Sequence, residues 1–238
     1  RGRFVERVQQ GHPTYAAMIE TLDSNVGRVM QKVEELGLEK NTIFIFMSDN
    51  GGLSTSEGSP TSNLPLRAGK GWMYEGGIRE PMLIKWPGSG SEGSISDVPV
   101  TSTDFYPTIL DMAGLELMPE QHMDGVSLVP LLSGEGQPDK RPLFWHYPHY
   151  SNQGGKPGAA VRQGDYKLIE FFDPGVVELY NLADDMGETT NLAEEMPEKA
   201  KEMLKLLHSW QKEVGAEGMD PNPAYDPEYL RENYLNRP

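Results

Sequence analysis

The sequence contains no cysteine in its 238 residues. Disulfide bonds, thiolate metal sites and a cysteine nucleophile are therefore excluded within this chain. Long apolar runs are also missing, because no uninterrupted stretch approaches the roughly 18 residues of a membrane helix. A basic, apolar and small-residue leader does not open the chain either. The first residue is Arg1 rather than Met, which is compatible with processing or truncation, so the missing leader says nothing about compartment.

Positive charge is scarce. Lys and Arg number 21 against 36 Asp and Glu, which gives a formal net charge of −15. This balance argues against nucleic acid or an anionic membrane as a bulk partner, because both bind clustered basic side chains. An anionic substrate would need a local basic pocket, and Arg67, Lys70, Arg79 and Lys85 are candidates within one short segment. Scattered surface charge is the alternative explanation for these four residues.

Hydrophobic residues make up 37% of the chain, which is enough to form the core of a globular protein. Apolar residues at spacings of three and four predict a helix that is capped by Thr14 and stops at Gly37. The run TIFIFM then predicts a buried strand, and PMLIKW (81–86) predicts a second one. Asp104 is a candidate cap for a helix that ends near Met112.

The pattern changes after Gly134. Short runs LFWHY, AAVRQ, YKLIEF and VVELY are separated by turn residues and predict an antiparallel meander. A helix from about 198 to 214 follows, and its apolar face is expected to cover the small sheet. The expected organisation is an α/β part over residues 1–135, an antiparallel subdomain with one helix over 136–216 and an extended tail over 217–238.

The stretch FIFMSDNGG ends a predicted strand on an acid, an amide and two glycines. Ligand sites of open parallel sheets lie just beyond the carboxyl ends of such strands. Asp49 and Asn50 offer hard oxygen donors to a cation there, while Gly51 and Gly52 let the backbone turn away. A simple turn that closes the strand is the alternative.

The segment PLRAGKGWMYEGGIREP (65–81) belongs to a long loop with neither helical nor strand periodicity. Glycines flank Lys70, so the backbone can approach a ligand closely while the flexible ammonium reaches it as a point charge. A solvated loop lysine also explains this pattern. A candidate metal pair and a lysine in one long loop are together a stronger indication of a functional site.

The ordered motifs YAAMIETLDSNVGR, NTIFIFMSDNGG, LRAGKGWMYEGGIREP, DFYPTILDMAG, DGVSLVPLL, VRQGDYKLIE and ELYNLADD resemble the type I sulfatase family of the alkaline-phosphatase-like superfamily. The resemblance runs from about Tyr15 to Trp210 and is nearest to sulfatases of the arylsulfatase and N-acetylgalactosamine-sulfatase kind. It implies an α/β fold, namely the carboxyl half of an alkaline-phosphatase-like sulfatase fold followed by a small antiparallel sheet with one packing helix.

The resemblance further implies hydrolysis of sulfate esters on a sulfated sugar or glycosaminoglycan fragment. By position, Asp49 and Asn50 are implied ligands of Ca²⁺, with Mg²⁺ as the alternative. Lys70 is the implied catalytic residue that contacts the sulfate. Arg79 and Glu75 are expected to pair and to organise the loop rather than to react. The family implies a periplasmic, extracellular or lysosomal location.

The family's nucleophile is a formylglycine made from Cys or Ser in a C/S-x-P-x-R motif, and this chain contains no such motif. NLPLR (63–67) keeps the proline and the arginine but has Asn63 in the nucleophile's place. The resemblance therefore implies that the nucleophile and the remaining ligands lie in an N-terminal half that is absent here. We expect this chain alone to be inactive.

HYPHY (146–150) places His146 and His149 among aromatic residues. Both are candidates for hydrogen bonding to a sugar substrate while Tyr147 or Tyr150 stacks on its ring. A strand end packed at the seam between two subdomains is the alternative.

Two other functions stay open. A phosphatase or phosphodiesterase of the same superfamily would use similar metal geometry, although GKG with EGGIR-P disfavours it. The chain could instead be a non-catalytic binding or assembly fragment that is stable only against a partner half. Exposed apolar surface along 44–47 and the first helix would indicate such a fragment.

Overall fold

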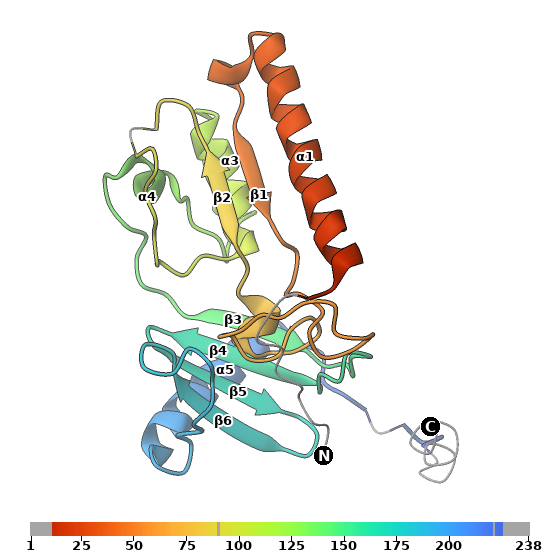
Figure 1. Ribbon diagram of the computed structural model, residues 1–238. Coiled ribbons are helices and arrows are strands. Elements are labelled where there is room, and N and C mark those ends of the chain that lie inside the picture. The colour runs from red at the N-terminus through yellow and green to blue at the C-terminus, as the bar shows by residue number, and fades with distance from the viewer. Residues whose placement is uncertain (1–10, 90, 221, 226–238) are drawn as a thin grey trace.

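The computed structural model describes residues 11–89, 91–220 and 222–225. Figure 1 shows two parts, with a long helix and a two-stranded ribbon above a four-stranded sheet, and the 51–80 loop between them. The elements of the first part are α1 (Pro13–Glu35), η1 (Glu39–Asn41), β1 (Phe44–Met47), α2 (Glu75–Ile78), β2 (Met82–Lys85), η2 (Ser102–Asp104), α3 (Phe105–Met112) and α4 (Val129–Ser133). No helix in the described ranges is long and apolar enough to cross a membrane.

Helix α1 matches the predicted length but not the predicted cap. The ring nitrogen Nδ1 of His12 accepts a hydrogen bond from the backbone N–H of Tyr15 at 3.2 Å, so His12 rather than Thr14 caps the helix. Pro13 follows at the first helical position, where its missing N–H costs nothing. Gly37 has φ +69° and ends the helix as predicted, because glycine adopts this conformation without strain.

Strand β1 pairs antiparallel with β2, with Phe44 opposite Lys85 and Met47 opposite Met82. Within the described residues, β2 is the strand that pairs with β1. Parallel neighbours require a crossover connection, usually a helix that returns along the sheet. The connection over 48–81 holds only the four-residue α2, so the chain simply runs back as an antiparallel strand.

Asp104 precedes α3 and is fully buried. Its carboxylate accepts hydrogen bonds from the backbone N–H groups of Thr101 and Val126, both at 2.9 Å, and pairs with Arg141. Asp104 occupies the N-cap position of α3, but its side chain makes no capping hydrogen bond to that helix, so the predicted capping role is wrong. Its carboxylate instead completes a reciprocal capping box with Thr101 at the start of η2. The same side chain also holds the linker that leads to the second part.

The second part is the predicted meander with its packing helix. Its sheet has the strand order β3 (Leu143–Tyr147), β4 (Gly158–Gln163), β5 (Tyr166–Phe171), β6 (Val176–Asn181), all antiparallel, and α5 (Pro197–Glu213) follows. Successive residues of a strand face opposite sides, so the sheet has two apolar faces. On one face Val161 and Leu168 contact Met203 and Leu207 of α5.

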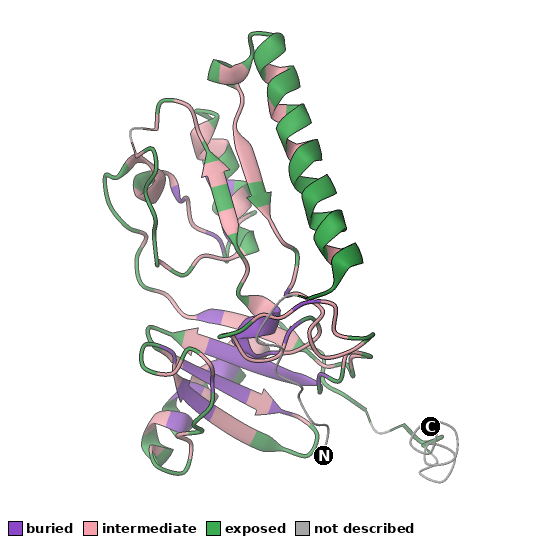
Figure 2. Ribbon diagram, viewed as in Figure 1, coloured by how far each residue is buried: buried purple, intermediate pink, exposed green. Residues whose placement is uncertain are grey.

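The other face of this sheet packs against the 51–80 loop. Ala160, Ile169 and Phe171 lie in one cluster with Met73 and Tyr74 of that loop. Figure 2 shows that the buried residues concentrate here, while α1 is exposed along its length. The small sheet therefore supports the loop that carries the predicted site.

Leu207→Ala should lower the free energy of unfolding by about 2 to 5 kcal/mol, because it opens a cavity at a fully buried position of α5. Urea unfolding followed by circular dichroism measures this loss. Lys205→Ala on the exposed side of the same helix is the matched control and should change stability by less than about 0.5 kcal/mol. Equal losses in the two variants would contradict the packing described above.

Candidate functional site

Asp49 and Asn50 directly follow β1, where the chain enters the 51–80 loop. Asp49 is exposed and Asn50 is half-buried. The hydroxyl of Ser48 donates a hydrogen bond to the backbone oxygen of Asn50 at 2.8 Å and so fixes the turn after the strand. The predicted placement of both side chains at the strand's mouth is confirmed.

The strand end is in direct backbone contact with α2. The N–H of Gly51 donates to the backbone oxygen of Gly77 at 3.1 Å. A Cβ on Gly51 would lie 1.8 Å from the backbone oxygen of Gly76, far inside van der Waals contact. Only glycine permits this approach at position 51, so the position of α2 determines where the strand end lies.

Lys70 lies beside the same strand end. Its backbone N–H donates to the backbone oxygen of Gly52 at 3.2 Å, and its side chain is exposed. A Cβ on the preceding Gly69 would lie 2.3 Å from that same oxygen. The structure therefore brings Asp49, Asn50 and Lys70 onto adjoining backbone segments, as the motif spacing indicates.

Asn63 is a residue whose role the sequence analysis missed. Its Nδ2 donates to the backbone oxygens of Gly52 at 2.8 Å and Ala68 at 2.9 Å, and its Oδ1 accepts from the N–H of Gly52 at 3.1 Å. One amide thus joins the start of the loop to the segment that leads to Lys70. No sequence pattern identifies this role, because the loop has no periodicity from which its closure could be predicted.

Glu75 and Arg79 do pair, but weakly. The Nη1 atom of Arg79 lies 3.9 Å from Glu75 Oε2, whereas Lys167 Nζ lies 2.9 Å from Glu75 Oε1. Glu75 is buried and Lys167 is fully buried. The main partner of Glu75 is thus a lysine 92 positions later in the chain, which the sequence analysis missed. The sequence indicates only that Lys167 faces inward, because it shares one face of its strand with Ile169 and Phe171, and it does not identify the partner.

A second carboxylate lies in the electrostatic field of Asp49. Partial burial, together with the negative charge of Asp49, raises the pKa of Glu80 to about 7. The Oε1 atom of Glu80 is buried without a hydrogen-bond partner. The vicinity of Asp49 is therefore rich in negative charge that a cation would offset.

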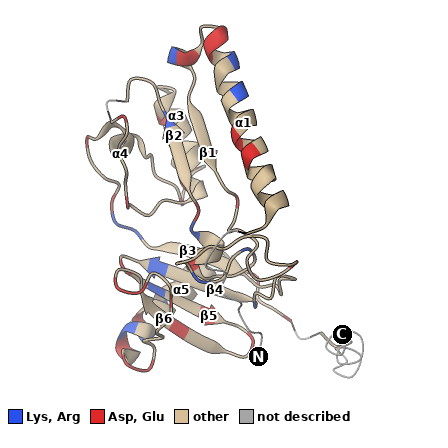
Figure 3. Cartoon of the chain, in the orientation of Figure 1, with Lys and Arg blue, Asp and Glu red and all other residues tan. Residues whose placement is uncertain are grey.

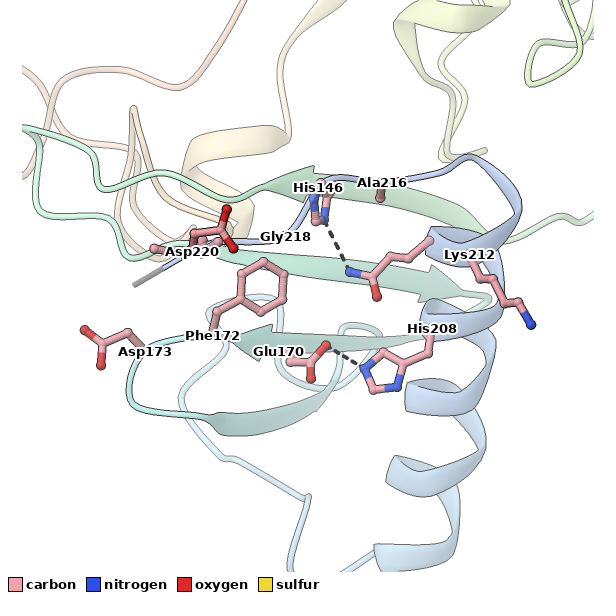
Figure 4. Close-up of a pocket in the computed structure, with 11 residues that line it drawn as sticks. His146, Glu170, Phe172, Asp173, His208, Lys212, Ala216, Gly218 and Asp220 are labelled. Carbon is pink, nitrogen blue, oxygen red and sulfur yellow. Dashed lines mark hydrogen bonds and ion pairs between the residues drawn. The ribbon is translucent and has the colours of Figure 1, made fainter. Parts of the chain in front are cut away.

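The structure separates the two predicted histidines. His146 pairs with Ala159, whose side chain faces α5, so His146 lies on the sheet face opposite the Lys70 loop. Its Nε2 is 2.7 Å from the backbone oxygen of Glu217, and its Nδ1 is 3.3 Å from Gln211 Nε2. His146 lines a groove of about 710 Å³, together with His208 and Lys212 of α5. Figure 4 shows these three residues around the groove.

His149 lies in the connection between β3 and β4, and it is exposed. This connection contacts the Lys70 loop, because the backbone oxygen of Gln153 accepts hydrogen bonds from Trp72 Nε1 at 3.1 Å and from Thr55 Oγ1 at 3.0 Å. The structure thus brings the segment of His149, but not the side chain of His146, to the loop of Lys70. Substrate binding by either histidine stays a prediction.

Two protein families match the sequence. The family described as N-sulphoglucosamine sulphohydrolase, C-terminal, matches residues 68–214, and the family described as Sulfatase matches residues 3–115. The chain belongs to the sulfatase family.

Similar proteins agree with this assignment. The sulfatase chain is 41% identical over 219 residues to a sulfatase of Formosa agariphila, an alignment that covers 82% of the chain and 39% of that protein. It is 34% identical over 230 residues to human arylsulfatase A, with 87% of the chain and 44% of that protein covered. The chain thus spans less than half the length of these curated relatives.

Solved structures share the fold. The crystal structure of Ps i-CgsB in complex with k-i-k-neocarrahexaose matches with a TM-score of 0.73 and 28% identity. The match covers 87% of the chain described here and 44% of Ps i-CgsB. A protein solved with its substrate D-Glucosamine-2-N, 6-O-disulfate matches with a TM-score of 0.69 and 30% identity, covering 89% and 42%. The alkaline-phosphatase-like fold predicted from the motifs is confirmed.

The donor chemistry of the site suits a hard cation in part. Asp49 and Asn50 supply carboxylate and amide oxygens, which are the donors that Ca²⁺ prefers, but Ca²⁺ takes about six to eight of them. Within the described residues, no group of three or more His, Cys, Asp or Glu side chains could hold a metal ion. The described residues of this sulfatase chain therefore supply only part of the oxygen ligands that a bound Ca²⁺ requires.

Gly51→Ala should lower the free energy of unfolding by about 1 to 3 kcal/mol, because the added Cβ would overlap the backbone of Gly76 and force α2 away. Thermal unfolding measures the loss. Gly27→Ala is the control, since a Cβ there meets nothing within 4 Å and alanine favours the helix. A Gly51→Ala protein as stable as the Gly27→Ala protein would contradict the close approach.

Proposed function

We propose that the complete protein that contains this chain hydrolyses sulfate esters of a sulfated sugar or glycosaminoglycan fragment. The observation that carries the proposal is the hydrogen bond from the Lys70 backbone to Gly52, which sets the lysine beside the strand end of Asp49 and Asn50. Membership of the sulfatase family supports the reaction type. Relatives such as an N-acetylglucosamine-6-O-sulfatase of Bacteroides thetaiotaomicron support a sugar as substrate class.

The proposed roles follow from charge. Asp49 and Asn50 would hold Ca²⁺, with Mg²⁺ as the alternative, and the bound cation would polarise the sulfate oxygens. The ammonium of Lys70 would oppose the negative charge on the sulfuryl oxygens and stabilise the leaving alkoxide. Glu75 and Arg79 keep the proposed organising role, in which they position the loop without touching the substrate. His149 could contact the sugar from its loop, whereas His146 would have to act from the opposite face of the sheet.

The proposed nucleophile is a formylglycine in an N-terminal half that completes the enzyme, as the absence of a C/S-x-P-x-R motif implies. The surface of α1 supports this proposal, because four of its large apolar side chains and Leu36 at its C-terminal cap are between 47% and 63% exposed. The four are Met18, Ile19, Leu22 and Val29. Phe46 on β1 is also 40% exposed. Monomeric proteins seldom leave such a surface uncovered.

The same surface favours a second candidate for the isolated chain. A fragment that is stable only against a partner half is expected to expose apolar residues along the first helix and the 44–47 strand. On this account the chain binds and aligns substrate and cation but has no turnover until its partner half is present. Intact-mass measurement of the natural protein, with peptide sequencing, would find or exclude a second polypeptide with the nucleophile motif.

Lys70→Ala in the complete protein should lower kcat for a sulfate ester by about 100-fold to 1000-fold, since it removes a charge that stabilises the transition state. Steady-state kinetics on a sulfated aryl or sugar substrate measures this. Lys40→Ala, remote in η1, is the control and should leave kcat unchanged. Near-normal hydrolysis by the Lys70→Ala protein would reject the role, and preferred turnover of the matching phosphate ester would favour a phosphatase.

Asp49→Ala should lower bound calcium as well as kcat, because it removes a proposed carboxylate ligand. Atomic emission measurement of calcium per mole of dialysed protein tests this directly. Asp124→Ala removes an exposed carboxylate far along the chain and should keep the calcium content of the unaltered protein. Unchanged calcium in the Asp49→Ala protein would contradict the assignment.

A further inference from the structure

The ammonium of Lys167 is fully buried between two carboxylates. Its Nζ lies 2.9 Å from Glu75 Oε1 and 2.9 Å from Glu188 Oε1. Lys167 belongs to β5 and Glu75 to α2, whereas Glu188 lies in the connection between β6 and α5. All three side chains are buried, so the network joins three segments that are distant in the sequence.

Glu188 also holds the backbone of α2. Glu75 is the first residue of the helix, and its backbone N–H donates a hydrogen bond to Glu188 Oε2 at 2.6 Å. The backbone oxygen of Glu188 accepts a hydrogen bond from Arg67 Nη1 at 2.7 Å, and the Arg67 guanidinium lies over the ring of Tyr74, 3.8 Å from its centroid. The start of α2 is therefore fixed through its side chain, its amide and its neighbour at position 74.

The position of α2 constrains the candidate site through direct backbone contacts. Gly77 accepts the backbone hydrogen bond of Gly51, and Gly51 has no room to move toward Gly76. Gly52 then accepts the backbone N–H of Lys70. A shift of α2 would thus displace the strand end of Asp49 and Asn50 together with Lys70.

Stability alone does not explain this network. Removing three charged groups from water is expensive, and replacing such groups with packed apolar residues is often neutral or stabilising. An apolar residue at position 167 would continue the inward register of Ile169 and Phe171 on β5. Charged groups do offer directional contacts of fixed geometry, which apolar packing cannot supply.

We propose that Lys167 and Glu188 are positioning residues of the sulfate-ester site, which act through Glu75 and α2 on Asp49, Asn50 and Lys70. This inference rests on the proposed function. Residues that orient the ligands of a metal site typically change metal affinity or activity by about 10-fold to 100-fold when they are removed. The interaction is neither with the substrate nor with the cation, so neither residue is itself catalytic.

The test uses Lys167→Met in the complete protein, well below the unfolding temperature. The expected result is a kcat about 10-fold to 100-fold lower with KM changed much less, and calcium affinity weakened over a similar range, because the lost alignment affects the transition state most. Calcium affinity is measured by titration of the calcium-depleted protein with the metal alone. This readout requires no turnover.

Leu207→Ala is the control for a purely structural effect. It destabilises the same sheet from the opposite face, where it contacts none of the three charged residues. Compared at temperatures equally far below their own Tm, Leu207→Ala should keep the kcat and calcium affinity of the unaltered protein. Equal losses in both variants would overturn the inference, as would unaltered kcat and affinity in Lys167→Met.

A second pair of variants covers the case in which Lys167→Met does not fold. Glu188→Gln keeps an acceptor for the N–H of Glu75, whereas Glu188→Ala does not. We expect Glu188→Gln to keep more kcat and calcium affinity than Glu188→Ala, and equal values would overturn the inference. If the unaltered protein hydrolyses no sulfate ester but binds calcium, the proposed function fails and calcium affinity still decides the positioning role. If it does neither, both fail.

Discussion

The contact between the strand end and α2 is the constraint on which the site depends. Backbone meets backbone where Gly51 approaches Gly76, and this leaves no space for a side chain. The loop has little regular structure between β1 and β2 apart from the four residues of α2. Its internal ties are the hydrogen bonds of Asn63 to Gly52 and Ala68. The ion pairs of Lys167 with Glu75 and Glu188 add contacts from the small sheet subdomain.

This arrangement explains why the sheet and the site occur in one chain. One face of the sheet packs against α5 and provides ordinary apolar stability. The other face packs against the loop through Met73 and Tyr74 and adds the buried charges. Figure 3 shows that the positions of charged residues are spread along the chain, with acidic and basic positions both present on α1.

The sequence predicted the features that depend on residues close to one another in the chain. The four-stranded meander and the stop at Gly37 follow from periodicity and turn residues, and the structure has both. The strand end of Asp49 was predictable because apolar runs that stop on glycines end strands. The partner of Glu75 was not, since Lys167 lies 92 residues away and only tertiary packing joins them. His146 shows the same limit, because the register of its strand decides which face it occupies.

A crystal structure of the complete protein, soaked with Ca²⁺ and a non-hydrolysed sulfate ester, is the most direct test of the account. We expect calcium coordinated by oxygens of Asp49 and Asn50 at about 2.3 to 2.6 Å, and the ammonium of Lys70 within hydrogen-bond distance of the sulfate. A cation bound away from Asp49 and Asn50, or a sulfate that Lys70 does not reach, would contradict the central claim that this loop forms the sulfate-ester site.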